Sequence, residues 1–496
     1  METYDVIVIG AGPVGENAAD RAARTGLSVA IVEAELVGGE CSYWACIPSK
    51  TLLRPGAARE AARQVPGLAD PGAPDAAAVL AWRDEMTSDG DDAGQVQWLD
   101  SAGLALVRGH GRLVGERLVE VTPAQGVDDD APGEPRRLEA RYAVVVATGS
   151  SAVLPGVPGL AEANPWTSRE ATSAEAVPES LVVVGGGVVG CEMATAYADL
   201  GARVTLLARS GLLTGAEPFA GRAVEESLRA AGVDVRLGAE VQGVERPEPG
   251  GPVTVTVVDA DAGAPAQVTA AELLVATGRR PRTGDVGLDT VGLDPHAALE
   301  IDDTTAVVGA APDAAGRPWL YACGDVTGRV ATTHQGKYQA RVSGDVVAAR
   351  FGADGARAAE VPTSDQGGWS RYEARADHGA QTQVVFTRPQ VAWVGPTESQ
   401  ARAAGLAVRA VPFDLAGVAG ASLLTPEYSG RAQVLVDTER EVIVGATFVG
   451  PEVGEMLHAA TIAVVGEVPL HRLWHAVPAF PTVSEVWLRF AEEYGL

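Results

Sequence analysis

The chain has 496 residues, more than one hydrophobic core usually supports, so we expect three or so domains. Its hydrophobic fraction of 46% and charged fraction of 21% are those of a globular protein, and its formal net charge of −27 argues against nucleic-acid and anionic-membrane partners, which bind concentrated positive charge. No apolar run reaches roughly 18 residues and no basic leader precedes the first strand pattern, so we expect a soluble, cytoplasmic protein.

The first pattern along the chain is a strand, a helix and a second strand. The apolar run YDVIVIG leads into Gly10, Gly12 and Gly15, a helical pattern follows, and LSVAIVE ends at Glu33. Such glycines at a helix start bring backbone amides up to a pyrophosphate, and a carboxylate at the end of the second strand accepts hydrogen bonds from a ribose diol. The segment predicts a dinucleotide site, with a tight turn that binds no nucleotide as the alternative.

The stretch GGECSYWACIPSK contains Cys41 and Cys46, five positions apart. An ideal helix would hold their Cα atoms roughly 8.6 Å apart, whereas a disulfide tolerates less than about 7 Å. A bond between them therefore needs a distorted turn, which Gly38, Gly39 and Pro48 favour. Four cysteines in so long a chain do not form a secreted disulfide framework. The pair predicts a strained, easily reduced disulfide used in redox chemistry.

The strand, helix and strand pattern returns about 175 residues later in SLVVVGGGVVGCEMATAYADLGARVTLLAR. It contains Gly185, Gly187 and Gly190, and its second strand ends before Arg209 and Ser210 instead of at an acid. An arginine and a serine suit the 2′-phosphate of NADPH, and the missing carboxylate removes a repulsion. The alternative is a solvated arginine at a strand end. The copy predicts a second dinucleotide site that prefers NADPH.

Each copy is followed by a strand and a Thr-Gly turn, AVVVATGS with Gly149 and LLVATGRRP with Gly278. The repeated plan makes both glycines candidates for cofactor binding. Two dinucleotide sites in one chain indicate that NAD(P)H delivers hydride to a bound flavin. After about residue 360 the strand and helix patterns predict an α+β domain of different character.

These motifs together resemble the FAD-dependent pyridine nucleotide-disulfide oxidoreductases, the family of dihydrolipoamide dehydrogenase, glutathione reductase and mercuric reductase. GGECSYWACIPSK is similar to the family's redox motif, YACGDVTG to its second FAD fingerprint, and VVFTRPQVAWVG to the start of its dimerisation domain. The resemblance implies an α/β fold with two Rossmann-like dinucleotide-binding domains and a C-terminal α+β dimerisation domain. The implied boundaries are 1–152 with 282–358 for a discontinuous FAD-binding domain, 153–281 for the NAD(P)H-binding domain, and 359–496 for the interface domain.

The resemblance also implies a role for individual residues. Cys46 would be the thiol nearest the flavin, which forms the charge-transfer thiolate, and Cys41 the outer thiol that attacks substrate. Lys50 and Glu192 would pair beside the flavin N5, where a lysine stabilises negative charge on a reduced flavin. Asp325 would bind the ribityl chain of FAD. The adenosine half of FAD would be held by Gly10, Gly12, Gly15 and Glu33. The remaining cysteines, Cys191 and Cys323, are expected to be small core residues.

The C-terminal segment departs from the family's pattern of histidine, proline, threonine and a later glutamate. In HAVPAFPTVSE the alignment places Phe480 at the position of the family's histidine, which serves the thiols of the other subunit. Glu485, the acid that would orient this histidine, then has nothing to orient. His471 and His475 could replace the histidine only with a different backbone. A thiol is only a few per cent ionised at pH 7 and a positioned base is worth roughly 10² to 10⁴ in rate, so we expect poor turnover of simple disulfides.

We therefore expect a homodimeric flavoenzyme, with an active site shared between subunits, that takes hydride from NADPH onto FAD, reduces the Cys41–Cys46 disulfide and passes the electrons to a small-molecule acceptor. NADH is the second candidate donor, and no metal, nucleic acid or membrane is expected to take part. The leading acceptor is a disulfide or related soft electrophile. The alternatives are a quinone or dye reduced directly from flavin, a dihydrolipoamide dehydrogenase, chemistry like that of ketopropyl-coenzyme M carboxylase, which also has phenylalanine at this position, and a redox-sensing component without turnover.

Overall fold

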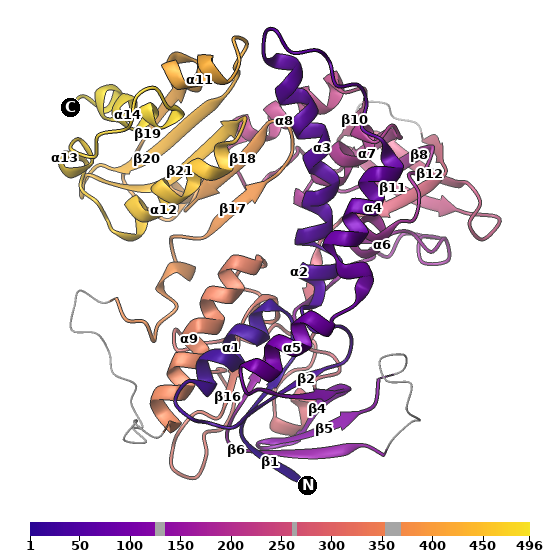
Figure 1. Ribbon diagram of the computed structural model, residues 1–496, viewed down its shortest axis with the longest axis vertical. Coiled ribbons are helices and arrows are strands. Elements are labelled where there is room, and N and C mark those ends of the chain that lie inside the picture. The colour runs from indigo at the N-terminus through magenta and orange to yellow at the C-terminus, as the bar shows by residue number, and fades with distance from the viewer. Residues whose placement is uncertain (125–133, 260–264, 353–368) are drawn as a thin grey trace. The chain divides into compact units, whose positions relative to one another are not determined.

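The computed structural model describes residues 1–124, 134–259, 265–352 and 369–496 (Figure 1). The chain divides into two compact units, each built from separate segments. The expected boundary between residues 358 and 359 lies outside the described residues. No helix in the described ranges is long and apolar enough to cross a membrane. Unit 1 comprises Met1–Ile47, Thr87–Ser151 and Arg279–Asp377, and unit 2 comprises Pro48–Met86, Ala152–Gly278 and His378–Leu496.

The main sheet of unit 1 has seven strands. Its order is β3 (Ala105–Arg108), β2 (Val29–Glu33), β1 (Glu2–Ile9), β6 (Arg136–Val146), β5 (Leu118–Thr122) and β4 (His110–Gly115), with β16 (Leu320–Ala322) also on β6. The strands β1, β2, β3 and β16 run parallel to their neighbours, whereas β4 and β5 are antiparallel. Both faces of β1 are buried, with Val6 and Val8 in one core and Ile7 and Ile9 in the other. This explains why the strand is a continuous apolar run.

Two helices pack side by side on one face of this sheet, α1 (Pro13–Ala23) and α9 (Thr333–Phe351) (Figure 1). Their backbones approach closely, since a Cβ added at Gly344 of α9 would lie 2.7 Å from the carbonyl oxygen of Ala18. Small residues on both helices therefore fix the position of α1, which begins with a proline suited to a helix start. The shorter elements of unit 1 are α2 (Gly39–Tyr43), α5 (Ala93–Ser101), and β15 (Arg279–Pro281), which pairs with β7 (Ser150–Ala152).

Unit 2 contains the second copy of the strand, helix and strand plan, as predicted from the sequence. Its parallel sheet has the order β10 (Asp234–Leu237), β9 (Arg203–Ala208), β8 (Ser180–Val184) and β14 (Glu272–Val275). One face packs against helices including α3 (Cys46–Gln64), α4 (Ala76–Met86), α6 (Ser168–Ser173), α7 (Val188–Asp199) and α8 (Pro218–Ala230). The other face packs against an antiparallel sheet of β11 (Ala239–Glu245), β12 (Val253–Asp259) and β13 (Ala266–Ala270).

The C-terminal part of unit 2 has the different, α+β character that was expected. Its antiparallel sheet, orange to yellow in Figure 1, has the order β17 (Thr382–Val385), β18 (Gln390–Val394), β21 (Val442–Gly450), β20 (Arg431–Asp437) and β19 (Val408–Asp414). Its helices are α10 (Glu398–Ala403), α11 (Ala419–Leu424), α12 (Leu457–Val465), α13 (Leu470–Leu473) and α14 (Val486–Tyr494).

Candidate functional site

The first glycine series forms the turn between β1 and α1, where the predicted dinucleotide site lies. A Cβ at Gly10 would lie 2.4 Å from the carbonyl oxygen of Ala147, and one at Gly15 would lie 1.8 Å from that of Gly10, so neither position admits a side chain. Gly12 has only one heavy atom within 4 Å of an added Cβ, which leaves its backbone open to a ligand. The turn therefore fits the pyrophosphate of a dinucleotide.

Glu33 lies at the end of β2 and holds this turn in place. Its Oε2 accepts a hydrogen bond of 2.6 Å from the backbone N–H of Ala11, and its Oε1 accepts one of 2.8 Å from that of Glu35. Burial raises the pKa of the Glu33 carboxyl, and these backbone hydrogen bonds oppose the rise. The acid predicted from the sequence is thus at the edge of the glycine turn, where a ribose would reach it.

A second loop of unit 1, which carries Asp325, lies against the first. A Cβ at Gly324 would lie 3.1 Å from Cγ1 of Val14, so the loop packs on the start of α1. The Ser150 hydroxyl donates a hydrogen bond of 2.6 Å to Oδ2 of Asp325. Gly149, the residue before that serine, has a φ of +74°, which glycine adopts without strain. Three predicted parts of the cofactor site are therefore brought together: the glycine turn, the Thr-Gly turn and the Asp325 loop.

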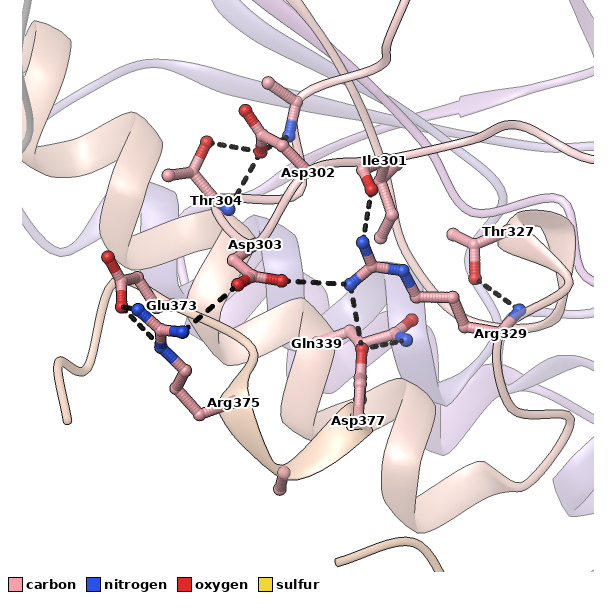
Figure 2. Close-up of polar contacts among 12 residues, drawn as sticks. Ile301, Asp302, Asp303, Thr304, Thr327, Arg329, Gln339, Glu373, Arg375 and Asp377 are labelled. Carbon is pink, nitrogen blue, oxygen red and sulfur yellow. Dashed lines mark hydrogen bonds and ion pairs between the residues drawn. The ribbon is translucent and has the colours of Figure 1, made fainter. Parts of the chain in front are cut away.

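Figure 2 shows part of a polar network around Asp377 and Arg329 that no sequence motif predicted. The side chain of Asp377 is only 1% exposed, and it accepts hydrogen bonds from Nε2 of Gln335 at 2.7 Å and from Nε2 of Gln339 at 2.8 Å. Gln339 in turn accepts a hydrogen bond of 2.7 Å from the backbone N–H of Gly324. The network thus connects the end of unit 1 to the loop that precedes Asp325.

Arg329 supplies the positive charge of this network (Figure 2). Its guanidinium lies 3.5 Å from carboxylate oxygens of both Asp303 and Asp377, and it donates a hydrogen bond to the carbonyl oxygen of Ile301. The members of the network are spread over more than 70 residues of sequence, from Ile301 to Asp377, and none of them belongs to a spaced motif. No sequence signal could therefore have grouped them.

The two cysteines of the redox motif lie in separate helical segments. Cys41 is in α2, which ends at Trp44 with φ −134° and ψ 0°, and α3 begins at Cys46. The helix is thus interrupted between the thiols, as the spacing required. The interruption is at Trp44, however, and not at Gly38, Gly39 or Pro48, which the sequence analysis had suggested as its cause.

The two glycines instead attach the redox segment to the glycine turn. The backbone N–H of Gly38 donates a hydrogen bond of 2.8 Å to the carbonyl oxygen of Ala11. A Cβ at Gly39, which has a φ of +56°, would lie 2.8 Å from Cα of Gly12. Only a residue without a side chain allows this approach. The redox segment and the predicted dinucleotide turn are therefore in direct contact.

Cys41 and Cys46 are both half-buried thiols that are not joined by a disulfide. Sγ of Cys46 lies 3.3 Å from Oγ1 of Thr333, the first residue of α9. A hydrogen bond with Cys46, burial and the negative charge of a Cys46 thiolate all raise the pKa of the Cys41 thiol, whereas Thr333 and the Lys337 ammonium lower it. The pair therefore keeps its proton on Cys41 when Cys46 is ionised. Such an arrangement suits an outer thiol that needs a base before it can attack.

Lys50 of α3 and Glu192 of α7 form the ion pair that was predicted. Lys50 Nζ lies 2.8 Å from Oε2 of Glu192, whose side chain is 4% exposed. Oε1 of Glu192 accepts a hydrogen bond of 2.9 Å from the backbone N–H of Phe386, and Lys50 Nζ lies 5.0 Å from the centroid of the Phe386 ring. The buried carboxylate thus has a partner on each oxygen, as a buried charge requires.

The second glycine turn repeats the geometry of the first. A Cβ at Gly185 would lie 2.2 Å from the carbonyl oxygen of Ala276, and one at Gly190 would lie 1.9 Å from that of Gly185. Among the described residues, no heavy atom lies within 4 Å of a Cβ added at Gly187, so its backbone is open. Gly278 has a φ of +132° and accepts a hydrogen bond on its carbonyl oxygen. This turn fits a second dinucleotide pyrophosphate.

Arg209 and Ser210 directly follow β9 and are both exposed. Within the described part of the chain, the Arg209 guanidinium has no hydrogen bond or ion pair. Its charge is therefore available to a ligand. Cys191 and Cys323 are completely buried, which confirms that they are core residues, and burial raises the pKa of each thiol to about 12.

The C-terminal candidates lie between α13 and α14. Phe480 is 74% exposed, and His471 and His475 are also exposed. Glu485 is buried, and its Oε1 accepts a hydrogen bond of 2.5 Å from Arg489 one turn along. Glu485 is therefore paired with an arginine, and its lack of a histidine to orient stays a prediction. Its Oε2 is buried and has no hydrogen-bond partner among the described residues.

Comparisons with known proteins agree with this geometry. A family model described as "Pyridine nucleotide-disulphide oxidoreductase" matches residues 4–340, and the model of that family's dimerisation domain matches residues 382–490. Dihydrolipoyl dehydrogenase from Thermus scotoductus is 31% identical over 99% of this chain and 97% of its own. Mercuric reductase from Staphylococcus aureus is 29% identical over 97% of this chain and 81% of its own. The copper(II) complex of the HOCl-induced flavoprotein disulfide reductase RclA from Escherichia coli has the same fold, with a TM-score of 0.79 at 22% identity over 99% of both chains.

Proposed function

The chain belongs to the FAD-dependent pyridine nucleotide-disulphide oxidoreductases and is an enzyme of that family, and we propose that it uses NADPH and FAD to reduce a Cys41–Cys46 disulfide whose electrons pass to a small-molecule acceptor. The observation that carries this proposal is the contact between Gly39 and Gly12. It holds the redox segment against the first dinucleotide turn. A flavin bound on that turn would share its unit with both thiols.

The residues of unit 1 fit FAD. The first glycine turn and Glu33 would hold its adenosine half, and Gly149 and Asp325 would hold the chain that leads to the ring system. The Ser150 hydroxyl fixes one Asp325 oxygen and leaves the other for a ligand hydroxyl. FAD, when bound, supplies the electron transfer between nicotinamide and disulfide. We assign residues 1–152 with 282–358 to the FAD-binding domain, 153–281 to the NAD(P)H-binding domain and 359–496 to the interface domain.

In this scheme the second glycine turn and Gly278 bind the nicotinamide nucleotide. The exposed Arg209, with Ser210 beside it, supports NADPH over NADH because a 2′-phosphate gains a cation there and meets no carboxylate. The Lys50 ammonium would stabilise negative charge on the reduced flavin. Glu192 keeps that lysine in position, since its carboxylate is itself fixed by the Phe386 backbone.

The match to the family's dimerisation domain supports a homodimer whose subunits share the active site. Val477 and Phe480 are exposed apolar residues in this domain, at 86% and 74%, as expected of a surface that a second subunit covers. We assign Phe480 to the position of the family's catalytic histidine. An exposed phenyl ring cannot carry a proton, so the acceptor is one that needs no base from this position.

Two classes of acceptor fit a dithiol without this histidine. The first is a disulfide or related soft electrophile that reacts with Cys41. The second is a quinone or dye reduced directly from flavin, which is favoured by the raised pKa of the Cys41 thiol because it bypasses that thiol. Dihydrolipoamide is a further candidate substrate, as the electron donor of the reverse reaction, because the relative from Thermus scotoductus is named a dihydrolipoyl dehydrogenase.

A screen of NADPH oxidation tests the proposal, with disulfides, quinones, metal ions and keto-thioethers as acceptors. Dihydrolipoamide with NAD⁺ tests the reverse direction. Each reaction is run on wild type, on Cys41→Ala and on Ser42→Ala as a control from the same helix. Acceptors that depend on the dithiol lose activity only in Cys41→Ala, whereas acceptors reduced from flavin keep it in all three proteins. Failure of every acceptor to oxidise NADPH with FAD-loaded wild type would overturn the proposal.

A further inference from the structure

The turn between β17 and β18, in the dimerisation domain, contacts two helices that lie far from it in the sequence. The backbone N–H of Phe386 donates a hydrogen bond of 2.9 Å to Oε1 of Glu192 in α7, and the Phe386 ring lies 5.0 Å from Nζ of Lys50 in α3. All three residues belong to unit 2. One end of the turn therefore contacts both partners of the Lys50–Glu192 ion pair.

Arg388, two residues further along the turn, holds the end of α7. Its Nη2 donates a hydrogen bond of 2.5 Å to Oδ1 of Asp199, and its Nη1 donates a second one to Oδ2. Two parallel hydrogen bonds between a guanidinium and a carboxylate fix the geometry of both side chains, which here are only 23% and 11% exposed. Asp199 is the last residue of α7, where the helix dipole disfavours an acid, so the arginine supplies the cation that this position needs.

The Arg388–Asp199 ion pair also lies directly on α3. A Cβ added at Gly56 would lie 2.0 Å from Oδ2 of Asp199 and 2.7 Å from Nη1 of Arg388, so only glycine leaves room for the ion pair at this point. These nearest atoms are the ends of two side chains and not backbone, so a larger residue would displace the ion pair and leave the helix intact. The contact at Gly56 therefore attaches α3 to the same turn.

The turn thus contacts α3 and α7 at two heights each. Lys50 and Gly56 are six residues apart, which is about 9 Å along α3. Glu192 and Asp199 are seven residues apart, which is about 10.5 Å along α7. Contacts at two heights oppose both sliding and rotation of one helix against the other, whereas a single contact would act as a pivot. The position of the Lys50 ammonium therefore depends on the ion pair of Arg388 as well as on Glu192.

We propose that Phe386 and Arg388 are positioning residues for Lys50, through which the dimerisation domain sets the rate at which NADPH reduces the flavin. This inference rests on the proposed role of Lys50, whose ammonium stabilises the negative charge of the reduced flavin. Phe386 acts on the lysine directly, and Arg388 acts through the Asp199 carboxylate and α3. Neither residue exchanges atoms or electrons with a ligand, so the hydride still passes from NADPH to the flavin as proposed above.

Acetylation of Lys50 tests the positioning without any turnover. The chain has only two lysines, Lys50 and Lys337, so the ratio of their acetylation rates with N-hydroxysuccinimidyl acetate, measured by mass spectrometry, contains its own reference. In FAD-loaded Arg388→Met this ratio should rise roughly three- to fivefold above wild type, because an amine whose ion pair is loosened is freer to meet the reagent. Gly56→Ala should raise the ratio as well, since its methyl group displaces the Arg388–Asp199 pair from α3.

Flavin reduction gives the second readout. Stopped flow measures the rate at which NADPH reduces the flavin in wild type, Arg388→Met, Lys50→Met and the double variant. Arg388→Met should be roughly tenfold slower than wild type, because a charged group misplaced near a reacting centre costs rate on that scale. The same substitution should have no further effect in the Lys50→Met background, where no ammonium is left to position.

Matched controls carry the same changes elsewhere. Arg402→Met removes an arginine that pairs with Glu398 at the surface of the same domain. Gly94→Ala fills a helical position in α5 where no heavy atom of the described chain lies within 4 Å of an added Cβ. Both should match wild type in the acetylation ratio and in flavin reduction. FAD absorbance per chain is recorded for every variant, so that a protein that has lost its fold is recognised.

Two results would overturn the inference. The first is an acetylation ratio that stays at the wild-type value in both Arg388→Met and Gly56→Ala. The second is an equal slowing of flavin reduction by Arg388→Met with and without Lys50, which is what a merely structural role of the arginine would give. If Lys50→Met reduces its flavin as fast as wild type, the proposed role of Lys50 fails, and the acetylation ratio alone then decides whether the turn positions the lysine.

Discussion

Gly39 packs against Gly12 so closely that a Cβ on Gly39 would lie 2.8 Å from Cα of Gly12. Gly39 is the first residue of the redox helix α2, and Gly12 is the middle glycine of the nucleotide turn. The two residues are therefore in contact through backbone atoms alone. The backbone hydrogen bond of 2.8 Å from Gly38 to the carbonyl oxygen of Ala11 joins the same two segments. The contact sets how near the dithiol lies to anything bound on the turn.

This contact predicts that Gly39→Ala loses flavin. The new methyl group would clash with the turn, and its φ of +56° costs an alanine about 1 to 2 kcal/mol in addition. Gly26→Ala is the matched control, because Gly26 also has a positive φ, +82°, yet no heavy atom of the described chain lies within 4 Å of an added Cβ. FAD absorbance per chain and the melting temperature of both variants are measured. Equal FAD content in the two would show that the contact does not position the flavin.

The fold and most of the candidate site were predictable because their signals are local. Each of these signals spans at most about 30 residues: the glycine series, the residues Glu33 and Arg209 at the ends of their strands, and the spacing of the two cysteines. Backbone geometry explains each of them. The ion pair of Lys50 with Glu192 joins residues 142 positions apart and could be predicted only through the family resemblance.

The remaining parts depend on packing between distant segments. Asp377 contacts Gln339 and Arg329 only because segments far apart in the sequence pack together, and each residue alone gives no signal beyond that of an ordinary polar side chain. The burial of Glu16 could not be predicted for a similar reason, since it depends on the approach of α9 to α1. Helical spacing predicts which face of a helix a residue occupies, but it does not predict which other element packs on that face.

The buried Glu16 predicts a pH-dependent gain in stability for Glu16→Gln. The pKa of this carboxyl is about 7 in the folded chain against 4.5 for its model value, so the folded state binds more protons between these values. Below about pH 4.5 Glu16 is protonated in both the folded and the unfolded chain, so its burial carries no penalty for a charge. As the pH rises from there through 7, the unfolded chain ionises first and the free energy of unfolding falls. Relative to wild type, Glu16→Gln should gain up to about 3 kcal/mol between pH 5 and pH 8. Guanidinium unfolding of the FAD-loaded proteins measures this, and a difference that stays constant with pH would contradict it.

The exposed Arg209 predicts a preference for NADPH that its charge controls. Wild type should show a kcat/KM for NADPH roughly tenfold above that for NADH, as one added ion pair at a partly exposed site gives. Arg209→Glu should invert the order, because a carboxylate repels the 2′-phosphate and accepts hydrogen bonds from a free ribose. Arg203→Glu is the control, since Arg203 starts the same strand and pairs with Glu179 at the surface. Equal kcat/KM values for both nucleotides in wild type would remove the basis of this assignment.

We predict that the apolar side chain of Phe480 determines which chemistry the thiol pair performs. Wild type reduced by two electrons should show a weak or alkaline-shifted thiolate-to-flavin charge-transfer band and slow reduction of simple disulfides. Phe480→His supplies a ring nitrogen near Glu485, whose Oε2 is buried and has no hydrogen-bond partner in the described chain, so it can still orient a histidine although Oε1 is held by Arg489. Disulfide reduction should then rise by between tenfold and 10³-fold, somewhat below the full value of a general base.

Stopped-flow reduction by NADPH from pH 6 to 10, with steady-state disulfide turnover, compares wild type with Phe480→His. His475→Ala is the control, because an exposed histidine outside the site should leave both measurements unchanged. If the wild-type band is complete at pH 6 and its disulfide turnover matches that of Phe480→His, Phe480 does not stand in the position of the base. A loss of turnover in His475→Ala would then identify His475 as the group that carries the proton.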